Sequence, residues 1–183
     1  EFMPVLSTRM QRLVENSATK FMVVNMPPRF CKSLTGQIFT EWQFGKNPSN
    51  RVITASYNER LAGQFAKHVR NSIQTPAGQG KSMQFADVFP GTKVSKKDAA
   101  ADMWSIEGSP VPSYLATSPG GTATGMGCNI MFVDDLIKNS MEAYSDLAKY
   151  SQAEWLLNTM MSRLEDDWKV IVIMTRWATD DLA

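Results

Sequence analysis

Residues 20–33 are the stretch that most constrains the fold, because an apolar run there turns directly into the start of a helix. The stretch reads KFMVVNMPPRFCKS. Its apolar part ends at two prolines, which predicts a buried strand, and Lys32 and Ser33 are expected to open a helix. A loop of this build directs backbone N–H groups at an anion. We therefore expect Lys32 to reach the β- and γ-phosphates of a nucleotide and Ser33 to coordinate Mg²⁺.

Two residues of this loop depart from the usual phosphate-binding pattern, G-x-x-x-x-G-K-[ST]. Met26 stands at its first glycine and Cys31 at its second. Glycine is usual before the lysine because the chain there tends to adopt conformations that disfavour a side chain, and because it passes close to phosphate. We expect either a strained backbone at Cys31 or a loop displaced from the usual path.

A second apolar run, at residues 129–135, ends in two carboxylates. It reads NIMFVDD, which is too short for a typical helix and is typical of a buried parallel strand that ends at an active site. An ATPase with a phosphate-binding loop also needs acidic residues to hold the metal and to activate water. We expect Asp134 to bind Mg²⁺ beside Ser33, and Asp135 to polarise the attacking water.

Strand and helix patterns alternate along the chain, which predicts an α/β fold with a mostly parallel sheet covered on both faces. Further strands are expected at 51–57, 113–117 and 169–175. Helices are expected over about ten residues from the Lys-Ser pair, at 59–74 after Asn58 as an N-cap, and at 142–165.

The composition is that of an ordinary globular protein. The 183 residues are 43% hydrophobic and 20% charged, with a net charge of +1, so the overall charge does not indicate nucleic-acid binding. Any contact with DNA would therefore have to come from a local basic patch or from assembly into a larger complex. Cys31 and Cys128 are far apart and have no nearby Cys or His residues at the spacing of a zinc site. The sequence contains no apolar run long enough to predict a membrane-spanning helix.

Four blocks of the sequence follow the patterns of one family. Residues 27–33, PPRFCKS, are similar to P-P-R-x-G-K-S, and residues 45–57, GKNPSNRVITASY, to G-x-x-P-x-x-R-V-I-x-A-S-Y. Residues 134–139, DDLIKN, are similar to D-D-P-x-K-N, and residues 175–182, TRWATDDL, to T-R-W-H-x-D-D-L. With these blocks in this order, the chain resembles the N-terminal ATPase domain of the large subunit of tailed-bacteriophage terminases.

The resemblance implies a fold and a set of binding residues. The fold would be a P-loop NTPase with a mostly parallel central sheet flanked by helices, and with an extra strand between the two nucleotide-binding strands. The strand at 170–175 would thus lie between the strands that end at Met26 and Asp134. The implied nucleotide-binding residues are Pro28, Arg29, Phe30, Cys31, Lys32, Ser33 and Leu34.

The resemblance also implies roles in catalysis and movement. Arg29 is similar to an arginine that stabilises transition-state charge from within the loop, and it would act with Lys32 and Asp135 in catalysis. Thr175 and Arg176 would sense hydrolysis and couple it to movement. The implied activity is Mg²⁺-dependent ATP hydrolysis that drives double-stranded viral DNA into a procapsid.

The partners and the setting follow from the same resemblance. The implied partners are double-stranded DNA, a small terminase subunit, the portal protein and further copies of the chain, in the cytoplasm of the host cell and without a membrane. Residues 3–183 would form a single ATPase domain, with residues 1–2 a cloning remnant and the C-terminal nuclease domain absent. Two alternatives stay open: a helicase-like nucleic-acid translocase, and a nucleotide-binding assembly module with little turnover because of Cys31.

Overall fold

A computed structural model describes residues 2–79, 82–121 and 125–177, and over these residues the chain forms an α/β fold with a mixed, mostly parallel sheet of seven strands. The strands are β1 (Phe21–Asn25), β2 (Val52–Ser56), β3 (Val94–Ala99), β4 (Met103–Ile106), β5 (Tyr114–Thr117), β6 (Cys128–Asp134) and β7 (Leu164–Met174). The helices are α1 (Phe2–Glu15), α2 (Lys32–Lys46), α3 (Glu59–Gln74), α4 (Phe85–Val88), α5 (Ser140–Ala143) and α6 (Asp146–Glu154), which continues as a π-helix (Trp155–Met160) and a 3₁₀ turn (Met161–Arg163).

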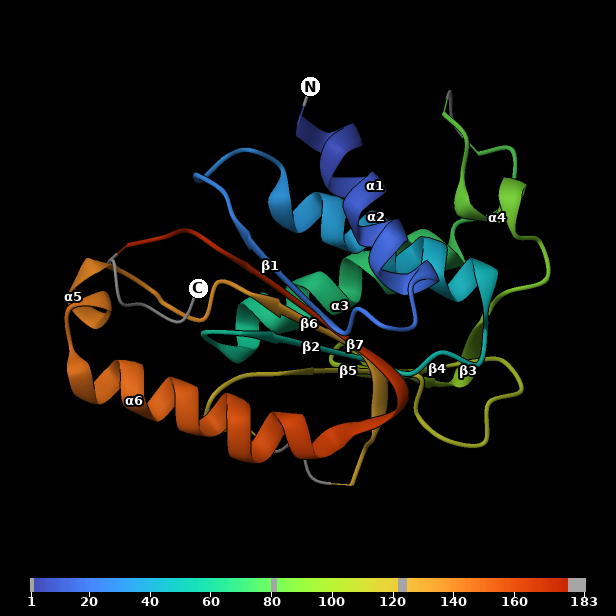
Figure 1. Cartoon of the computed structure of the whole chain (residues 1–183). Helices are drawn as coiled ribbons and strands as arrows, with labels where there is room; N and C mark the ends of the chain where they lie inside the picture. The colour runs from blue at the N-terminus through green and yellow to red at the C-terminus, as the bar shows by residue number, and fades with distance from the viewer. Residues whose placement is uncertain (1, 80–81, 122–124, 178–183) are drawn as a thin grey trace.

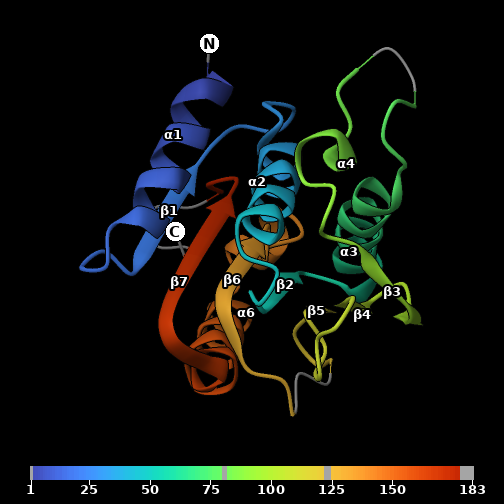
Figure 2. The same ribbon diagram turned by 90° about the vertical axis from the view of Figure 1, so that its right-hand side faces the viewer.

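The strand order places the expected extra strand where the resemblance implies it. The order is β1-β7-β6-β2-β5-β4-β3, so β7 lies between β1 and β6 and pairs with both in parallel (Figure 2). The β2 strand pairs in parallel with β6 and β5, whereas β4 and β3 extend the sheet in antiparallel fashion. The carboxyl ends of β1, β7, β6 and β2 therefore meet at one edge of the sheet.

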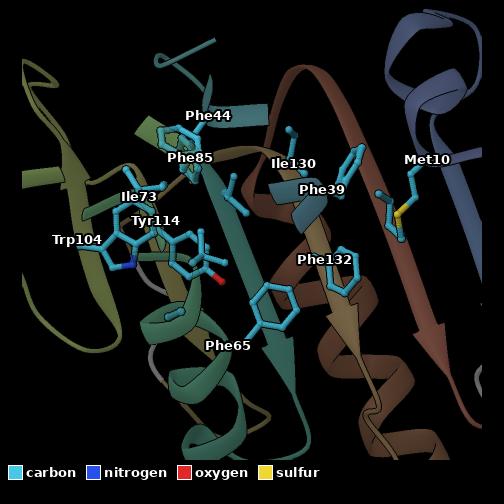
Figure 3. Packing of buried hydrophobic residues seen from close by; sticks show 14 of the residues in the cluster. Met10, Phe39, Phe44, Phe65, Ile73, Phe85, Trp104, Tyr114, Ile130 and Phe132 are labelled. Carbon is cyan, nitrogen blue, oxygen red and sulfur yellow. The ribbon is translucent and has the colours of Figure 1, made fainter. Parts of the chain in front are cut away.

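Alternate residues of the central strands face two apolar cores, as expected for a sheet covered on both faces. Ile130 and Phe132 of β6 lie in the core beneath α1, α2 and α3. Met131 and Val133 of the same strand lie in the opposite core, with Met160 of the π-helix. Figure 1 shows these layers with α6 on the far side of the sheet from α1 and α2, and Figure 3 shows the aromatic packing of the first core.

The predicted helix at 59–74 is confirmed, and its N-cap is the one expected. The side chain of Asn58 accepts a hydrogen bond from the backbone N–H of Leu61 at 2.9 Å. Phe65, Val69 and Ile73 are buried along one face, as their spacing predicts. Leu61, the first residue of that predicted stripe, is instead 38% exposed, and the buried face passes through the neighbouring Ala62 at this end of the helix.

The predicted single helix at 142–165 is wrong in its boundaries and continuity. The chain forms the short α5, turns at Tyr144, and starts again as α6, where the Ser145 side chain caps the backbone N–H of Ala148 at 3.3 Å. Ser and Asp compete for backbone hydrogen bonds and so favour helix starts over helix interiors. Residues 164–168 belong to β7, which begins earlier than the predicted strand because a register irregularity lets its polar end pair with β6.

Gly36 lets α2, the helix that follows the loop after β1, approach the sheet closely. A Cβ built on Gly36 would overlap the ring of Phe132, which is fully buried and packs against Phe65 with ring centroids 5.3 Å apart (Figure 3). We expect Gly36→Ala to lower the free energy of unfolding by about 1–3 kcal/mol in a urea titration, because the ring has no free space. Gly63→Ala is the matched control on α3, where the added carbon would meet no atom within 4 Å beyond its chain neighbours and the nearby backbone of its own helix. An equal loss in both variants would contradict the steric explanation.

Glu41 on α2 is a carboxyl group packed against α3. Ser72 Oγ donates a hydrogen bond to its Oε2 at 2.8 Å, and burial raises the pKa of Glu41 from 4.5 to about 7. The folded protein then binds more protons than the unfolded chain between these two values, so this group lowers stability as pH rises through that range. We expect Glu41→Gln to gain stability relative to the parent between pH 5 and pH 8, as followed by thermal unfolding. The exposed Glu107→Gln is the control, and a pH-independent difference for Glu41→Gln would contradict the prediction.

Candidate nucleotide-binding site

The loop between β1 and α2 has the strained backbone that the sequence predicts for Cys31. Cys31 has φ 57° and ψ 23°, in the left-handed region, and Arg29 has φ 67°. A left-handed backbone costs a non-glycine residue roughly 1–2 kcal/mol. The loop is nevertheless anchored at both ends, because Met26 N–H donates to Met174 O at 3.1 Å and Thr35 N–H to Cys31 O at 2.9 Å.

The acidic end of β6 lies next to this loop and is fixed by two strands. Asp135 N–H donates to Ile173 O of β7 at 2.9 Å, and Tyr57 N–H, after β2, donates to Asp135 O at 3.2 Å. Asp135 itself has φ 47°. The backbone thus turns sharply at the point where β6 ends, and this turn directs the side chain of Asp135 towards α2.

Lys32, Asp135 and Thr175 form a hydrogen-bonded cluster that joins three elements. Lys32 Nζ lies 2.8 Å from Asp135 Oδ1 and 2.7 Å from Oδ2, and it also donates to Thr175 Oγ1. The backbone N–H of Thr175 donates to Asp135 Oδ1 at 2.8 Å. Lys32 is only 6% exposed, so this pair is screened less by solvent than a surface ion pair. The charge of the buried lysine is therefore balanced by Asp135 in this conformation.

Asp134 and Ser33 offer an oxygen-rich pair that suits a hard cation. The pKa of Asp134 is raised to about 6, mainly by burial and also by the charge of Asp135, although a hydrogen bond from the Ser33 side chain and the charge of Lys32 act in the opposite direction. Asp134 Oδ1 is buried and has no hydrogen-bond partner among the described residues. Magnesium is commonly held by one or two carboxylates together with phosphates and water. The donor set therefore fits Mg²⁺, which would also satisfy the unpartnered carboxylate oxygen.

A cavity of about 380 Å³ opens between these segments, beyond the carboxyl ends of β1, β7 and β6 on the left-hand side of Figure 1. Parallel α/β sheets characteristically bind ligands at this edge. Of the residues that the sequence singles out, those that line it are Pro28, Arg29, Cys31, Lys32, Ser33, Leu34, Asp135 and Thr175. Other cavities have similar volumes, including one of about 450 Å³ between α1 and α2, so cavity volume alone does not identify this site.

Three of the singled-out residues lie outside the cavity lining. Asp134 is partly buried behind it, and Arg176 follows β7 as an exposed residue. Phe30 turns away and packs edge-on against Phe2 of α1, with ring centroids 5.4 Å apart. Residues 178–182 of the fourth sequence block lie outside the described residues.

Four lining residues carry no assigned role from the sequence. They are Tyr57, Ile137, Lys138 and Trp177. Each lies within a few residues of a strand end that the sequence does indicate, and each falls inside one of the four sequence blocks. The signal was therefore present, but only the arrangement of strands identifies which neighbours of a motif face the cavity.

Comparisons with known proteins identify the fold. No protein family and no curated protein matches the sequence. The N-terminal domain of the DNA packaging ATPase from bacteriophage phi29 is similar in structure, with a TM-score of 0.56 and 14% identity over 94% of this chain and 80% of that one. A variant of Saccharomyces cerevisiae Dbp5, in a complex that contains ADP, has a TM-score of 0.50 and 10% identity over 95% of this chain and 42% of that one. Among the described residues, no helix has the length and apolar character needed to cross a membrane. The protein has an α/β fold with a mostly parallel seven-stranded sheet that is similar in structure to P-loop ATPase domains.

Proposed function

We propose that the protein hydrolyses ATP with Mg²⁺ and that this hydrolysis powers the translocation of double-stranded DNA into a viral procapsid. The observation that carries the first part is the cavity at the carboxyl ends of β1, β7 and β6, which Arg29, Lys32, Ser33 and Asp135 all line. A cationic loop beside a carboxylate is the arrangement that phosphoryl transfer to water requires.

The residues have distinct roles in this proposal. Lys32 binds the β- and γ-phosphates, and Arg29 balances the charge that develops on the terminal phosphate. Ser33 and Asp134 hold Mg²⁺, which when bound neutralises phosphate charge. In the proposal, a phosphate first displaces Asp135 from Lys32. Asp135 then accepts a hydrogen bond from the attacking water and orients this water for in-line attack.

The motor function is supported by the resemblance of the sequence blocks and by the structural similarity to the phi29 packaging ATPase domain. In that function the partners are DNA, a small terminase subunit, the portal protein and further copies of this chain. The hydrogen bond from Lys32 Nζ to Thr175 supports a coupling role, because a ligand that binds Lys32 competes with Asp135 and Thr175 for the same ammonium group. Arg176 follows directly along the chain and shares this role in the proposal.

Two other functions remain as candidates. A helicase-like translocase is favoured by the similarity to Dbp5, of which this chain spans less than half. A nucleotide-binding assembly module with little turnover is favoured by the left-handed backbone at Cys31.

Phosphate release from ATP by the purified chain, with Mg²⁺ and with EDTA in its place, tests the proposal. Metal-dependent release that rises in the presence of double-stranded DNA, with no strand separation of a duplex, supports a packaging ATPase. Strand separation would favour the helicase-like alternative. Tight nucleotide binding without phosphate release would favour the assembly module.

A further inference from the structure

The charges that line the cavity are not balanced, and this imbalance indicates where a polyanion sits. Three cations line it, Arg29, Lys32 and Lys138, against one carboxylate, Asp135. Asp135 pairs with Lys32. Within residues 2–79, 82–121 and 125–177, the side chains of Arg29 and Lys138 form no ion pair. Two unpaired cations in one small cavity repel each other, so an anionic ligand with several charges would be stabilised between them.

Lys138 approaches the cavity from the opposite wall to the phosphate-binding loop. The loop that carries Arg29 and Lys32 follows β1, at one edge of the sheet, whereas Lys138 follows β6, with β7 in between. Both walls therefore contribute a positive charge. A short ligand held only by the loop would not reach the cation on the opposite wall, whereas a longer phosphate chain would reach it.

The backbone at Lys138 is held in place although its side chain is exposed. The neighbouring Leu136 and Ile137 are buried, at 0% and 3% exposure. The backbone N–H of Lys138 donates to Glu142 Oε2 at 3.0 Å, and Asn139 Oδ1 accepts from the backbone N–H of Glu142 at 3.1 Å. This local network fixes the Cα of Lys138 at the cavity rim, which reduces the entropy lost when its side chain binds a ligand.

We infer that Lys138 contacts the terminal phosphate of the ligand and makes the site selective for a triphosphate over a diphosphate. This inference rests on the proposed function for the identity of the nucleotide, but its charge argument concerns phosphate chains of any kind. Lys32 and Arg29 would hold the phosphate chain from the side of the loop, and the terminal phosphate would also lie beside Asp135, three residues before Lys138. A lysine ammonium binds phosphate as a point charge, so it recognises the presence of this group rather than its orientation.

The test compares inorganic tripolyphosphate with pyrophosphate, and AMP-PNP with ADP, by calorimetric titration in Mg²⁺ buffer. Removing one charge-assisted contact should weaken tripolyphosphate and AMP-PNP binding to Lys138→Met about tenfold, with pyrophosphate and ADP within about twofold of the parent. Lys138→Arg should retain most of the affinity. Lys67→Met removes an exposed lysine on α3 that does not line the cavity, and it serves as the control.

The outcomes separate this inference from the proposed function. Equal losses for the long and short phosphate chains in Lys138→Met, or no loss, would overturn the assignment of Lys138. In another outcome, the parent protein binds tripolyphosphate more tightly than pyrophosphate, loses this preference in Lys138→Met, and binds neither AMP-PNP nor ADP. That result would support the assignment of Lys138 and overturn the ATPase proposal. Parent protein that binds none of the four ligands would overturn both. Unchanged thermal unfolding of the variants shows that the comparison concerns folded protein.

Discussion

Lys32→Ala should strongly weaken ATP binding, whereas Asp135→Asn should slow hydrolysis and bind ATP more tightly than the parent. Lys32 contacts the phosphates in the ground state, and its loss should weaken ATP binding by about 100-fold. Asp135 acts on water in the transition state, so its replacement should slow turnover by about 10²–10⁴-fold. Asp135 also competes with phosphate for Lys32 Nζ at 2.7–2.8 Å, and a neutral amide competes less.

Equilibrium binding of a fluorescent ATP analogue and phosphate release measure the two effects separately. Lys46→Ala, at the last turn of α2, is the control for removal of a lysine from the same helix. Near-normal turnover in either site variant would remove that residue from the proposed mechanism. Weaker ATP binding in Asp135→Asn would show that the Lys32 contact with Asp135 organises the site instead of competing for it.

Cys31→Gly should bind ATP more tightly and turn it over faster than the parent. Cys31 occupies a left-handed conformation, with φ 57°, that glycine adopts without a steric penalty. If this penalty of roughly 1–2 kcal/mol is borne only by the bound state, its relief corresponds to about a five- to thirty-fold gain in affinity. Isothermal titration with ATP and a phosphate-release assay would measure both quantities.

Cys31→Ala separates the backbone from the thiol. Alanine keeps the left-handed penalty but removes the sulfur, so it should resemble the parent if the backbone is responsible. A gain in Cys31→Ala equal to that in Cys31→Gly would instead point to a steric contact between the thiol and phosphate. Unchanged affinity and turnover in both variants would mean that the strain at Cys31 is the same with and without nucleotide.

The sequence predicts well those parts of the fold that carry a single strong pattern, either an apolar run or an amphipathic helix with a clear N-cap. The strands β1 and β6 contain apolar runs, and α3 combines an N-cap at Asn58 with a helical apolar stripe. The prediction that β1 is buried is wrong, because β1 lies at the edge of the sheet and Phe21 and Val23 are 41% and 51% exposed, whereas β6 is mostly buried. The position of β7 between β1 and β6 is confirmed, but it rests on family resemblance, because periodicity does not specify strand order. Lys32, Asp135 and Thr175 were singled out from separate segments, and the fold brings them into hydrogen-bonding contact.

The parts that sequence did not predict depend on tertiary contacts. The α1 helix carries its buried residues, Leu6, Met10 and Leu13, in a stretch that contains a proline and no clear cap. The β3 and β4 strands are short and lie in a stretch rich in Gly, Ser and Lys, where antiparallel pairing onto β5 decides the structure. Lys138 falls inside the sequence block at 134–139, but only the arrangement of the strands shows that it lines the cavity.

The long central strand β7 limits how the site can move. Its eleven residues span about 36 Å at the usual rise, from the 3₁₀ turn after α6 to the residue before Thr175. Residues 170–173 of β7 are paired on both sides, so this part of the strand cannot slip by one residue without breaking two ladders and reversing the faces of its side chains. If Thr175 moves, either the loop that follows it must change conformation or the whole sheet must tilt as a rigid body. In the second case, the π-helical segment beyond the opposite end of β7 would move with it, so the strand would act as a lever between the two edges of the molecule.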